Sequence, residues 1–268
     1  NDVFVGTYTG AVTDTFGATD ILDGNAGTDT LIIVPNGVAA ITPADSLWTG
    51  ITDIEKILIT TTGAGAQTIT TGAFFEAAFA AAGVDLTKTS DAGAITLDMS
   101  TFTGVATLTT TSGAGAQTIT TGSGVTTVTA TSGAGALTIT GANLATVNAI
   151  TTGAGAQTIT STGAGNVIVN ATSEAGATTI TTGAGKDTIT LFASAAAGAN
   201  VITGGAGADI IALVTGVFAA TDTIVIGNAD SGITVATADK ITGFATGIDQ
   251  LKMGTAGDAT ALTGTYVE

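Results

Sequence analysis

TSGAGAQTIT, residues Thr111–Thr120, recurs almost unchanged along this chain. It returns as TSGAGALTIT at Thr131–Thr140, and as TTGAGAQTIT at Thr61–Thr70 and at Thr151–Thr160. It appears once more with a pointed change, as TTGAGKDTIT at Thr181–Thr190. Such regular repetition indicates stacked, nearly identical structural units.

The apolar residues inside the Thr-x-Thr units give the register of these units. Two series interleave with a period near 20, and their members are Ile119, Ile139, Ile159 and Ile180 in one, and Leu108, Val128, Val147, Ile168 and Ile189 in the other. Two series per period predict two short strands per coil. Because side chains alternate along a strand, Ile points inward where both Thr point outward, and coils stack at about 4.8 Å. The Gly-Ala-Gly segments turn the corners, where positive φ is cheap only for Gly.

We therefore predict an all-β fold, a right-handed parallel β-solenoid of β-roll type with about 20 residues per coil and one short side helix. Each coil buries its apolar face against its neighbours. The alternative is an antiparallel sandwich of hairpins, but hairpins do not require identical residues every 20 positions.

Composition restricts the possible partners. The chain has 268 residues, of which 21 are acidic and five are Lys, and it has no Arg, His or Cys. The net charge of −16 excludes a nucleic acid partner, since phosphate binding needs clustered basic residues. Thiol, zinc–histidine and histidine acid–base chemistry are excluded. No apolar run is long enough to span a membrane. Since the chain begins at Asn1 without a leader, we expect a fragment or a processed product.

The acidic residues divide the chain. Twelve lie in residues 1–100, one lies in 101–186 and eight lie in 187–268. We therefore expect four parts: an acidic segment with a loop excursion (1–60), a first repeat plus side helix (61–100), an uncharged solenoid (101–190) and a calcium-binding β-roll with a cap (191–268). The charge makes divalent cations the natural ligand of both ends.

Three segments carry a calcium-type motif. Residues 24–32 read GNAGTDTLI, residues 183–187 read GAGKD and residues 204–212 read GGAGADIIA. They match G-G-x-G-x-D-x-U-x, in which turn carbonyls and the Asp carboxylate bind Ca²⁺ between coils. The candidate ligand positions are Asp29, Asp187 and Asp209 with Gly24, Gly27, Gly185, Gly204 and Gly207. The alternative is that these Asp residues only form turns by accepting backbone N–H bonds.

These motifs resemble the repeats-in-toxin (RTX) β-roll family of secreted bacterial proteins. Asp20–Leu31 looks like two consecutive half-repeats, Asn200–Ile211 looks like another pair, and Asn1-Asp2-Val-Phe resembles the end of one more. Residues 238–251 resemble the segment that closes such β-rolls, and residues 50–57 resemble a step between RTX blocks. The resemblance adds as candidate calcium ligands Asp20, Asp23, Asn200, Asp2, Asp239 and Asp249.

The middle block departs from the family pattern. The Asp position appears there as Gln67, Gln117, Leu137 and Gln157. We expect these coils to be metal-free, with Gln as a hydrogen-bonding replacement for the ion.

The resemblance implies a calcium-dependent fold, secretion and a place at the bacterial cell surface, closest to RTX-type S-layer proteins. We expect a structural protein, not an enzyme, that assembles with copies of itself into a lattice or filament. Cell-surface polysaccharide would be contacted, if at all, through a part outside this chain. The alternatives are ice binding through the Thr array, an adhesin repeat domain, and a sugar hydrolase, which would need two carboxylates close together in a cleft.

Several segments interrupt the repeat. Thr71–Gly83 carries Phe and Ala at helical spacing, which predicts a short amphipathic helix that plugs the core or contacts another subunit. Leu191–Gly198 is expected to be a helical turn or a loop. Residues 33–60 read as a loop excursion that returns through a strand at Ile54–Thr60. We expect strands at Thr223–Ile226 and Gly232–Ala236, and solenoid ends that are capped or paired with another molecule.

Overall fold

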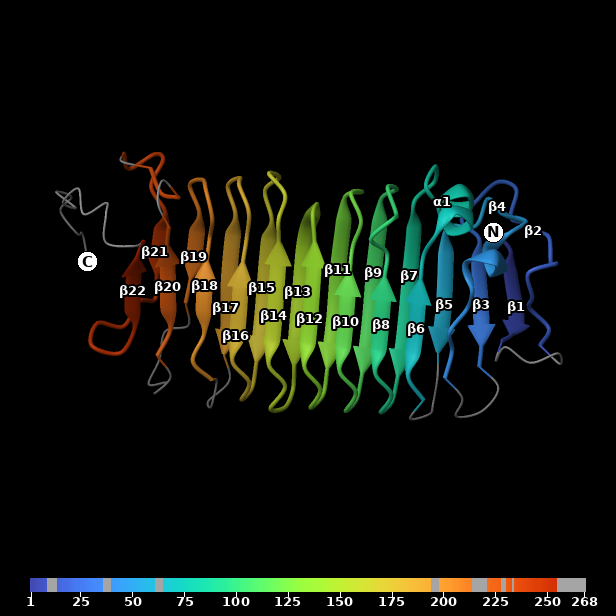
Figure 1. Ribbon diagram of the computed structural model, residues 1–268, viewed down its shortest axis with the longest axis horizontal. Coiled ribbons are helices and arrows are strands. Elements are labelled where there is room, and N and C mark those ends of the chain that lie inside the picture. The colour runs from blue at the N-terminus through green and yellow to red at the C-terminus, as the bar shows by residue number, and fades with distance from the viewer. Residues whose placement is uncertain are drawn as a thin grey trace.

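The computed structural model is a parallel β-solenoid with one α-helix among the residues that it describes, which confirms the predicted fold class. It describes residues 1–8, 14–35, 40–60, 65–193, 198–213, 221–227, 230–232 and 234–254. The coils stack into an elongated rod whose strands lie across its long axis (Figure 1). Coils average about 22 residues, slightly more than the predicted 20.

Two long parallel sheets form the two faces of the rod. The eleven-stranded sheet contains, in spatial order, β1 (Val3–Thr7), β3 (Thr30–Val34), β5 (Lys56–Thr60), β7 (Val84–Ser90), β9 (Ala106–Ser112), β11 (Thr126–Ser132), β13 (Leu144–Thr151), β15 (Ile168–Ser173), β17 (Thr188–Ala193), β19 (Ile210–Ala212) and β21 (Lys240–Thr242).

The second face is a nine-stranded sheet. Its strands are, in chain order, β6 (Gln67–Thr70), β8 (Ile95–Asp98), β10 (Gln117–Thr120), β12 (Leu137–Gly141), β14 (Gln157–Ser161), β16 (Thr178–Thr181), β18 (Val201–Thr203), β20 (Thr223–Ile226) and β22 (Gln250–Met253). A separate parallel pair is formed by β2 (Leu22–Asp23) and β4 (Ile51–Thr52).

The strand register confirms one predicted apolar series and corrects the other. Ile119, Ile139, Ile159 and Ile180 are consecutive register partners and are fully buried. In the other series, however, Val147 pairs with Val169 and not with Ile168. Ile168 is 46% exposed, whereas Val169 is fully buried. The predicted position was wrong by one residue, which in a strand moves a side chain to the opposite face.

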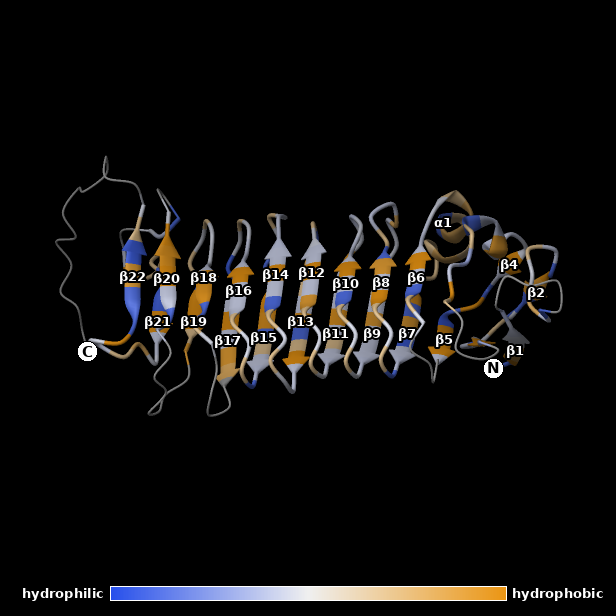
Figure 2. Cartoon of the chain, turned by 60° about the horizontal axis from the view of Figure 1, so that its bottom comes forward, coloured by the Kyte–Doolittle hydropathy of each residue, from blue (hydrophilic) through white to orange (hydrophobic). Residues whose placement is uncertain are grey.

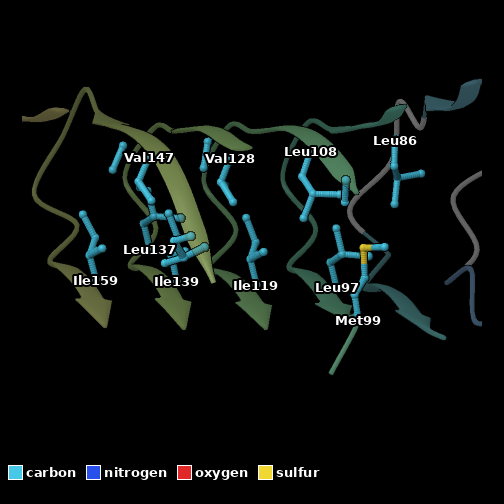
Figure 3. Close-up of a cluster of buried hydrophobic side chains, with 14 of the residues drawn as sticks. Leu86, Leu97, Met99, Leu108, Ile119, Val128, Leu137, Ile139, Val147 and Ile159 are labelled. Carbon is cyan, nitrogen blue, oxygen red and sulfur yellow. The ribbon is translucent and has the colours of Figure 1, made fainter. Parts of the chain in front are cut away.

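The core is a single thin layer between the two sheets. Side chains from the two sheets point toward each other, as Leu108 and Val128 do toward Leu97 and Ile119 (Figure 3). Thr residues alternate with them and lie on the outside of the rod, as predicted. The core is therefore one ladder of aliphatic residues that runs from coil to coil.

The predicted side helix is confirmed as α1 (Ala73–Phe79), which lies at the N-terminal part of the rod beside β4 (Figures 1 and 2). Phe75 and Phe79 are fully buried against Trp48 of the 3-10 helix η1 (Asp45–Trp48), with ring centroids 5.2 and 5.8 Å apart. From β9 to β17 the buried apolar residues are aliphatic, whereas α1 and η1 make room for a cluster of aromatic residues near the N-terminus.

The expectations for the remaining segments have mixed outcomes. The loop excursion returns through β5, and the strand Thr223–Ile226 is confirmed as β20. Residues 191–193 continue β17, so they are neither helix nor loop, and residues 194–197 lie outside the described residues. Within Gly232–Ala236, the described residues do not form the expected strand, because residues 235–237 form a turn closed by the Thr237 amide and the Thr234 carbonyl.

Candidate cation site at the coil junctions

Each coil turns twice, so the rod has two edges. We call the edge that leads into the eleven-stranded sheet the aspartate edge, because Asp29, Asp187, Asp209 and Asp239 directly precede β3, β17, β19 and β21. We call the edge that leads into the nine-stranded sheet the glutamine edge, because Gln67, Gln117 and Gln157 begin β6, β10 and β14.

This geometry corrects one expectation. Gln117 does not stand in the column of Asp187 and Asp209, since it leads into the other sheet. The phrase at Thr151–Thr160 and its Asp version at Thr181–Thr190 start 30 residues apart, which is about one and a half coils. The two versions therefore lie on opposite edges of the rod.

Near the C-terminus, the coils are joined on the aspartate edge by the carboxylates of Asp187, Asp209 and Asp239. We call these three residues, together with Asp29, the ladder aspartates. The Val167 amide donates to Asp187 Oδ1 at 2.8 Å, and the Asp187 amide donates to Asp209 Oδ1 at 2.8 Å. The Asp209 amide then donates to Asp239 Oδ1 at 3.0 Å. Each carboxylate thus accepts the backbone N–H of the preceding coil and holds the two coils together.

Near the N-terminus the same arrangement occurs. The Asp2 amide donates to Asp29 Oδ1, and the Asp29 amide donates to Glu55 Oε2 at 2.8 Å. Oδ1 of each ladder aspartate therefore accepts a backbone N–H that lies 20 to 30 residues away in a neighbouring coil. This bond joins coils and is not the turn-forming bond of the alternative. It does not account for the other oxygen.

The second oxygen of each ladder aspartate is buried. Within the described residues, no hydrogen-bond partner contacts Oδ2 of Asp29, Asp187, Asp209 or Asp239. The side chains of Asp29, Asp187 and Asp209 are at most 1% exposed. The Thr182 hydroxyl, which lies near Asp187, donates to the Gly204 carbonyl instead. A buried carboxylate oxygen without a partner is unfavourable, so these atoms are the positions in the described chain where a cation would be most favourable.

Burial makes the ionised form of Asp187, Asp209 and Asp239 costly. Burial raises the pKa of Asp209 to about 7. The hydrogen bond from the Asp187 amide lowers this pKa, whereas the negative charges of Asp239, Asp187 and Asp230 raise it. Burial likewise raises the pKa of Asp187 and Asp239. A divalent cation reverses this preference, because it stabilises the ionised form of an adjacent carboxylate.

The turns before three of these aspartates share a backbone conformation. Gly27, Gly185 and Gly207 each lie two residues before the Asp and have φ of 139°, 137° and 150°. On the glutamine edge, Gly115, Gly135 and Gly155 do not have positive φ, so the expectation that the Gly-Ala-Gly corners depend on it was wrong there. Glycine is needed for space instead, because a Cβ at these positions would come 2.1 to 2.2 Å from a carbonyl oxygen of the neighbouring coil. Gly24 and Gly204 are needed for space, since a Cβ on Gly204 would come 2.5 Å from Asp209 Oδ2.

In the middle of the rod, backbone carbonyls replace the carboxylates on the aspartate edge. The amides of Val84, Ala106 and Thr126 donate to the carbonyls of Val105, Val125 and Asn143 in the next coil, at 2.9 to 3.0 Å. The coil junction there is closed by neutral groups only.

The glutamine edge is closed in the same neutral way, with additional side-chain bonds. The Gln117 amide side chain accepts from the Thr110 hydroxyl at 2.6 Å and donates to the Thr131 carbonyl of the next coil. The hydroxyls of Ser112, Ser132 and Ser173 donate to the carbonyls of Gly115, Gly135 and Gly176 in their own turns.

Toward the C-terminus, the glutamine edge also becomes polar. Asn200 Oδ1 accepts the Thr178 amide and Asn200 Nδ2 donates to Asp222 Oδ1, both at 2.8 Å. The Asp222 amide donates to Asp249 Oδ1 at 3.0 Å. Burial raises the pKa of Asp222. Asp222 itself was not among the ligand residues predicted from the sequence. Its signal was an Asp directly before the predicted strand Thr223–Ile226, 22 residues after Asn200.

The remaining candidates lie apart from the ladder carboxylates. Asp2 contributes its amide but its side chain is exposed. Asp20 accepts the Gly17 amide, and Asp23 accepts the Asn25 amide in a tight turn at β2. Glu55, which was quoted only as part of the step at residues 50–57, is brought to Asp29.

In the part of the chain that the structure describes, no three acidic side chains converge enough to hold a metal ion by themselves. A cation would need turn carbonyls or water in addition to one or two carboxylates. None of the described helices has the length and apolarity to cross a membrane. Comparison with protein-family models, curated proteins and solved structures found no match for this chain.

Proposed function

We propose that this protein is a calcium-dependent structural protein of the bacterial cell surface, which assembles with copies of itself into a surface layer or filament. The observation that carries the proposal is the set of buried Oδ2 atoms on Asp29, Asp187, Asp209 and Asp239, which lack a hydrogen-bond partner among the described residues. They lie at coil junctions on either side of residues 101–186, a block with a single acidic residue.

Calcium fits the chemistry of this set. Ca²⁺ takes six to eight oxygen ligands from carboxylates, backbone carbonyls and water, and it tolerates irregular geometry. Here the candidate carboxylates are those of Asp29, Asp187, Asp209 and Asp239. When bound, the ion would neutralise buried negative charge where two coils meet. The protein's own contribution is to hold each carboxylate in place through its Oδ1 bond to the preceding coil.

The rod supports assembly more than catalysis. The chain contains no His, Cys or Arg, and its middle block carries one acid in residues 101–186. The net charge of −16 opposes contact between copies unless cations reduce it. Non-closing contacts between copies give filaments or lattices.

The experiment is electron microscopy of the protein at fixed concentration, with calcium and after chelation. We expect ordered arrays or filaments in calcium and dispersed particles in the chelator. The double variant Asp187→Asn/Asp209→Asn should assemble poorly in calcium. The matched control is Asp91→Asn, which changes an exposed acid by the same atoms. Assembly that persists in chelator, or that the double variant leaves intact, would reject the proposal.

A second candidate, ice binding, is favoured by the register of the nine-stranded sheet. Its outward Thr residues form two unbroken rows across β10, β12, β14 and β16, namely Thr118, Thr138, Thr158 and Thr179, and Thr120, Thr140, Thr160 and Thr181. The opposite face is interrupted by Asn148 and Asn170 and by exposed Ile168 and Phe192.

Thermal hysteresis separates this candidate from the first. If the nine-stranded face binds ice, Thr158→Tyr should remove the activity and Thr107→Tyr on the other face should preserve it. Absence of ice shaping by the unaltered protein would end this alternative.

A further inference from the structure

We propose that the solenoid consists of two kinds of folding unit: a rod at residues 84–177 that is stable without metal, and coils on either side whose stability depends on a divalent cation. This inference rests on the proposed function only in assigning calcium to the carboxylate junctions. The division itself comes from a change in how successive coils are joined.

On the aspartate edge, the change is visible in one column of amides. The amides of Val84, Ala106 and Thr126 donate to backbone carbonyls of the next coil. The amides of Val167, Asp187 and Asp209, which precede the corresponding strands further along, donate to carboxylates. The same donor position therefore has a neutral acceptor at Val84, Ala106 and Thr126, and a charged acceptor from Val167 onward, where the rod meets the coil of Asp187.

On the glutamine edge, the change occurs at nearly the same level. The amides of Gln117, Leu137 and Gln157 donate to the carbonyls of Ala136, Ala156 and Ala177 at 2.8 to 2.9 Å. The amide of Thr178 donates instead to the Asn200 side chain, and that of Asp222 donates to Asp249. Toward the C-terminus both edges change together, so the transition there belongs to the coil and not to one turn. Toward the N-terminus only the aspartate edge changes, because the Gln67 amide still donates to the Ala94 carbonyl.

The two kinds of junction differ in whether they leave a buried polar atom without a hydrogen bond. A bond between a backbone amide and a carbonyl is neutral and satisfies both the donor and the acceptor. A ladder aspartate accepts the amide through its Oδ1, but Oδ2 of Asp187 and of Asp209 remains buried without a hydrogen-bond partner among the described residues. Successive coils also place one negative charge above another, and like charges in a buried column repel. A cation relieves both costs, and a ligand that binds only the folded form stabilises it.

The rod has its own substitutes for the ion. Thr110 and Thr131 are joined through the Gln117 side chain, which links one coil to the next. Gln157 makes the equivalent bond to the Thr172 carbonyl at 2.6 Å. The apolar ladder passes through these coils without interruption. The buried oxygens without a hydrogen-bond partner in residues 84–177 are the neutral ones of Ser90, Thr121, Gln157 and Ser161, and none of the buried side chains there is a carboxylate that a cation would have to neutralise.

The division has a consequence for assembly. Loss of calcium would loosen the end coils, including the Asp29 junction, while the rod persists. Interfaces formed by the ends could then be released and restored without refolding the whole chain.

The test is hydrogen exchange of the full chain, followed by mass spectrometry in excess calcium and in excess chelator. At calcium a hundredfold above its dissociation constant, we expect amides in 187–193, 198–213 and 221–227 to be protected about 100-fold more than in chelator. Peptides within 106–161 should exchange at equal rates in both conditions. Far-UV circular dichroism in chelator should retain the β signal of the rod.

Two sets of variants provide the controls. Asp187→Asn/Asp209→Asn should remove the calcium response of the C-terminal coils and leave peptides 106–161 unchanged. Gln117→Ala/Gln157→Ala should speed exchange in 106–161 equally with and without calcium.

The outcomes separate this inference from the proposed function. Loss of protection in all coils on chelation would overturn the division, while calcium dependence would stand. No change in any coil would overturn both. Loss confined to the end coils supports both.

Discussion

Asp209 shows most clearly what a single ladder residue does. Its Oδ1 closes the junction with the coil of Asp187, and its Oδ2 is buried and unpartnered within the described chain. Its pKa is raised to about 7, first by burial. Without a cation, the ionised side chain is therefore a cost at neutral pH, although the residue occupies a hydrogen-bonded structural position. Asn200 performs the same acceptor role on the other edge without the charge.

The variant Asp209→Asn tests this balance. An amide can still accept the Asp187 N–H but cannot carry the buried charge, so the calcium-free protein at pH 8 should become more stable. The calcium-induced rise in Tm should shrink in the same variant, because a ligand oxygen has lost its charge. Differential scanning calorimetry with and without calcium measures both effects. An equal calcium response in variant and parent would contradict this account, as would an effect of similar size for Asp91→Asn.

Lys88 is a second residue whose charge conflicts with its surroundings. It points into the core from β7, is 1% exposed, and donates to the Thr89 carbonyl at 3.0 Å. Burial lowers the pKa of its amine from 10.5 to about 8. In the unfolded chain the amine has its ordinary pKa of 10.5. Between about pH 8 and pH 10.5 the unfolded state therefore binds more protons than the folded state.

The stability of the protein should therefore rise as pH increases from about 8 to about 10.5, and should carry the full penalty below pH 8. Lys88→Met should remove this slope and stabilise the protein at pH 7 by on the order of 1–3 kcal/mol. Urea unfolding of both proteins at pH 7 and pH 10 checks the prediction. A parallel pH dependence in the variant would show that Lys88 is not its source.

For single strands, the position along the chain could be predicted from the sequence more reliably than which residues point into the core. Period-20 Ile residues located β10, β12, β14 and β16, since each strand has one apolar residue between Thr residues. The segment Val167-Ile168-Val169 has three apolar residues in a row, so its pattern fits either face equally well. The turn at 162–167 decides which residue points inward, and turn geometry was not visible in the pattern.

Paired substitutions test the register of β15. Val169→Asp would place a carboxylate in the apolar core and should destabilise the protein by more than about 4 kcal/mol, or prevent folding. Ile168→Asp, one residue away, should change stability by less than about 0.5 kcal/mol because its side chain faces solvent. Chemical denaturation compares them. A reversed order would mean that the register of β15 is wrong.

Helix α1 has a structural role that the same approach can measure. Phe79 is fully buried and packs beside Phe75 and Trp48, with ring centroids 4.6 and 5.8 Å away. Phe79→Ala should cost about 3–5 kcal/mol because it opens a cavity in this aromatic cluster. Phe74→Ala on the same helix removes a side chain that is 47% exposed and should cost far less. Equal losses in thermal unfolding would argue that α1 packs differently.

For the whole molecule, the repeated phrase predicted the solenoid fold, and the uneven distribution of acidic residues placed the candidate cation sites near its two ends. What repetition could not show was the edge to which each turn belongs. The Gln and Asp phrases are locally alike, and only their separation of 30 residues places them on opposite edges. Asp222 was missed because no Gly-rich turn of the motif precedes it, although it lies in the column of Asn200 and Asp249.

The central claim is that a cation completes the carboxylate junctions and not the neutral ones. The most direct measurement is a crystal structure of the calcium-saturated protein, with the ions identified by anomalous scattering. The account predicts metal beside the Oδ2 atoms of Asp29, Asp187, Asp209 and Asp239, and none beside Gln117 or Gln157. Empty carboxylate junctions at saturating calcium, or ions distributed along the neutral coil junctions of residues 84–177, would contradict it.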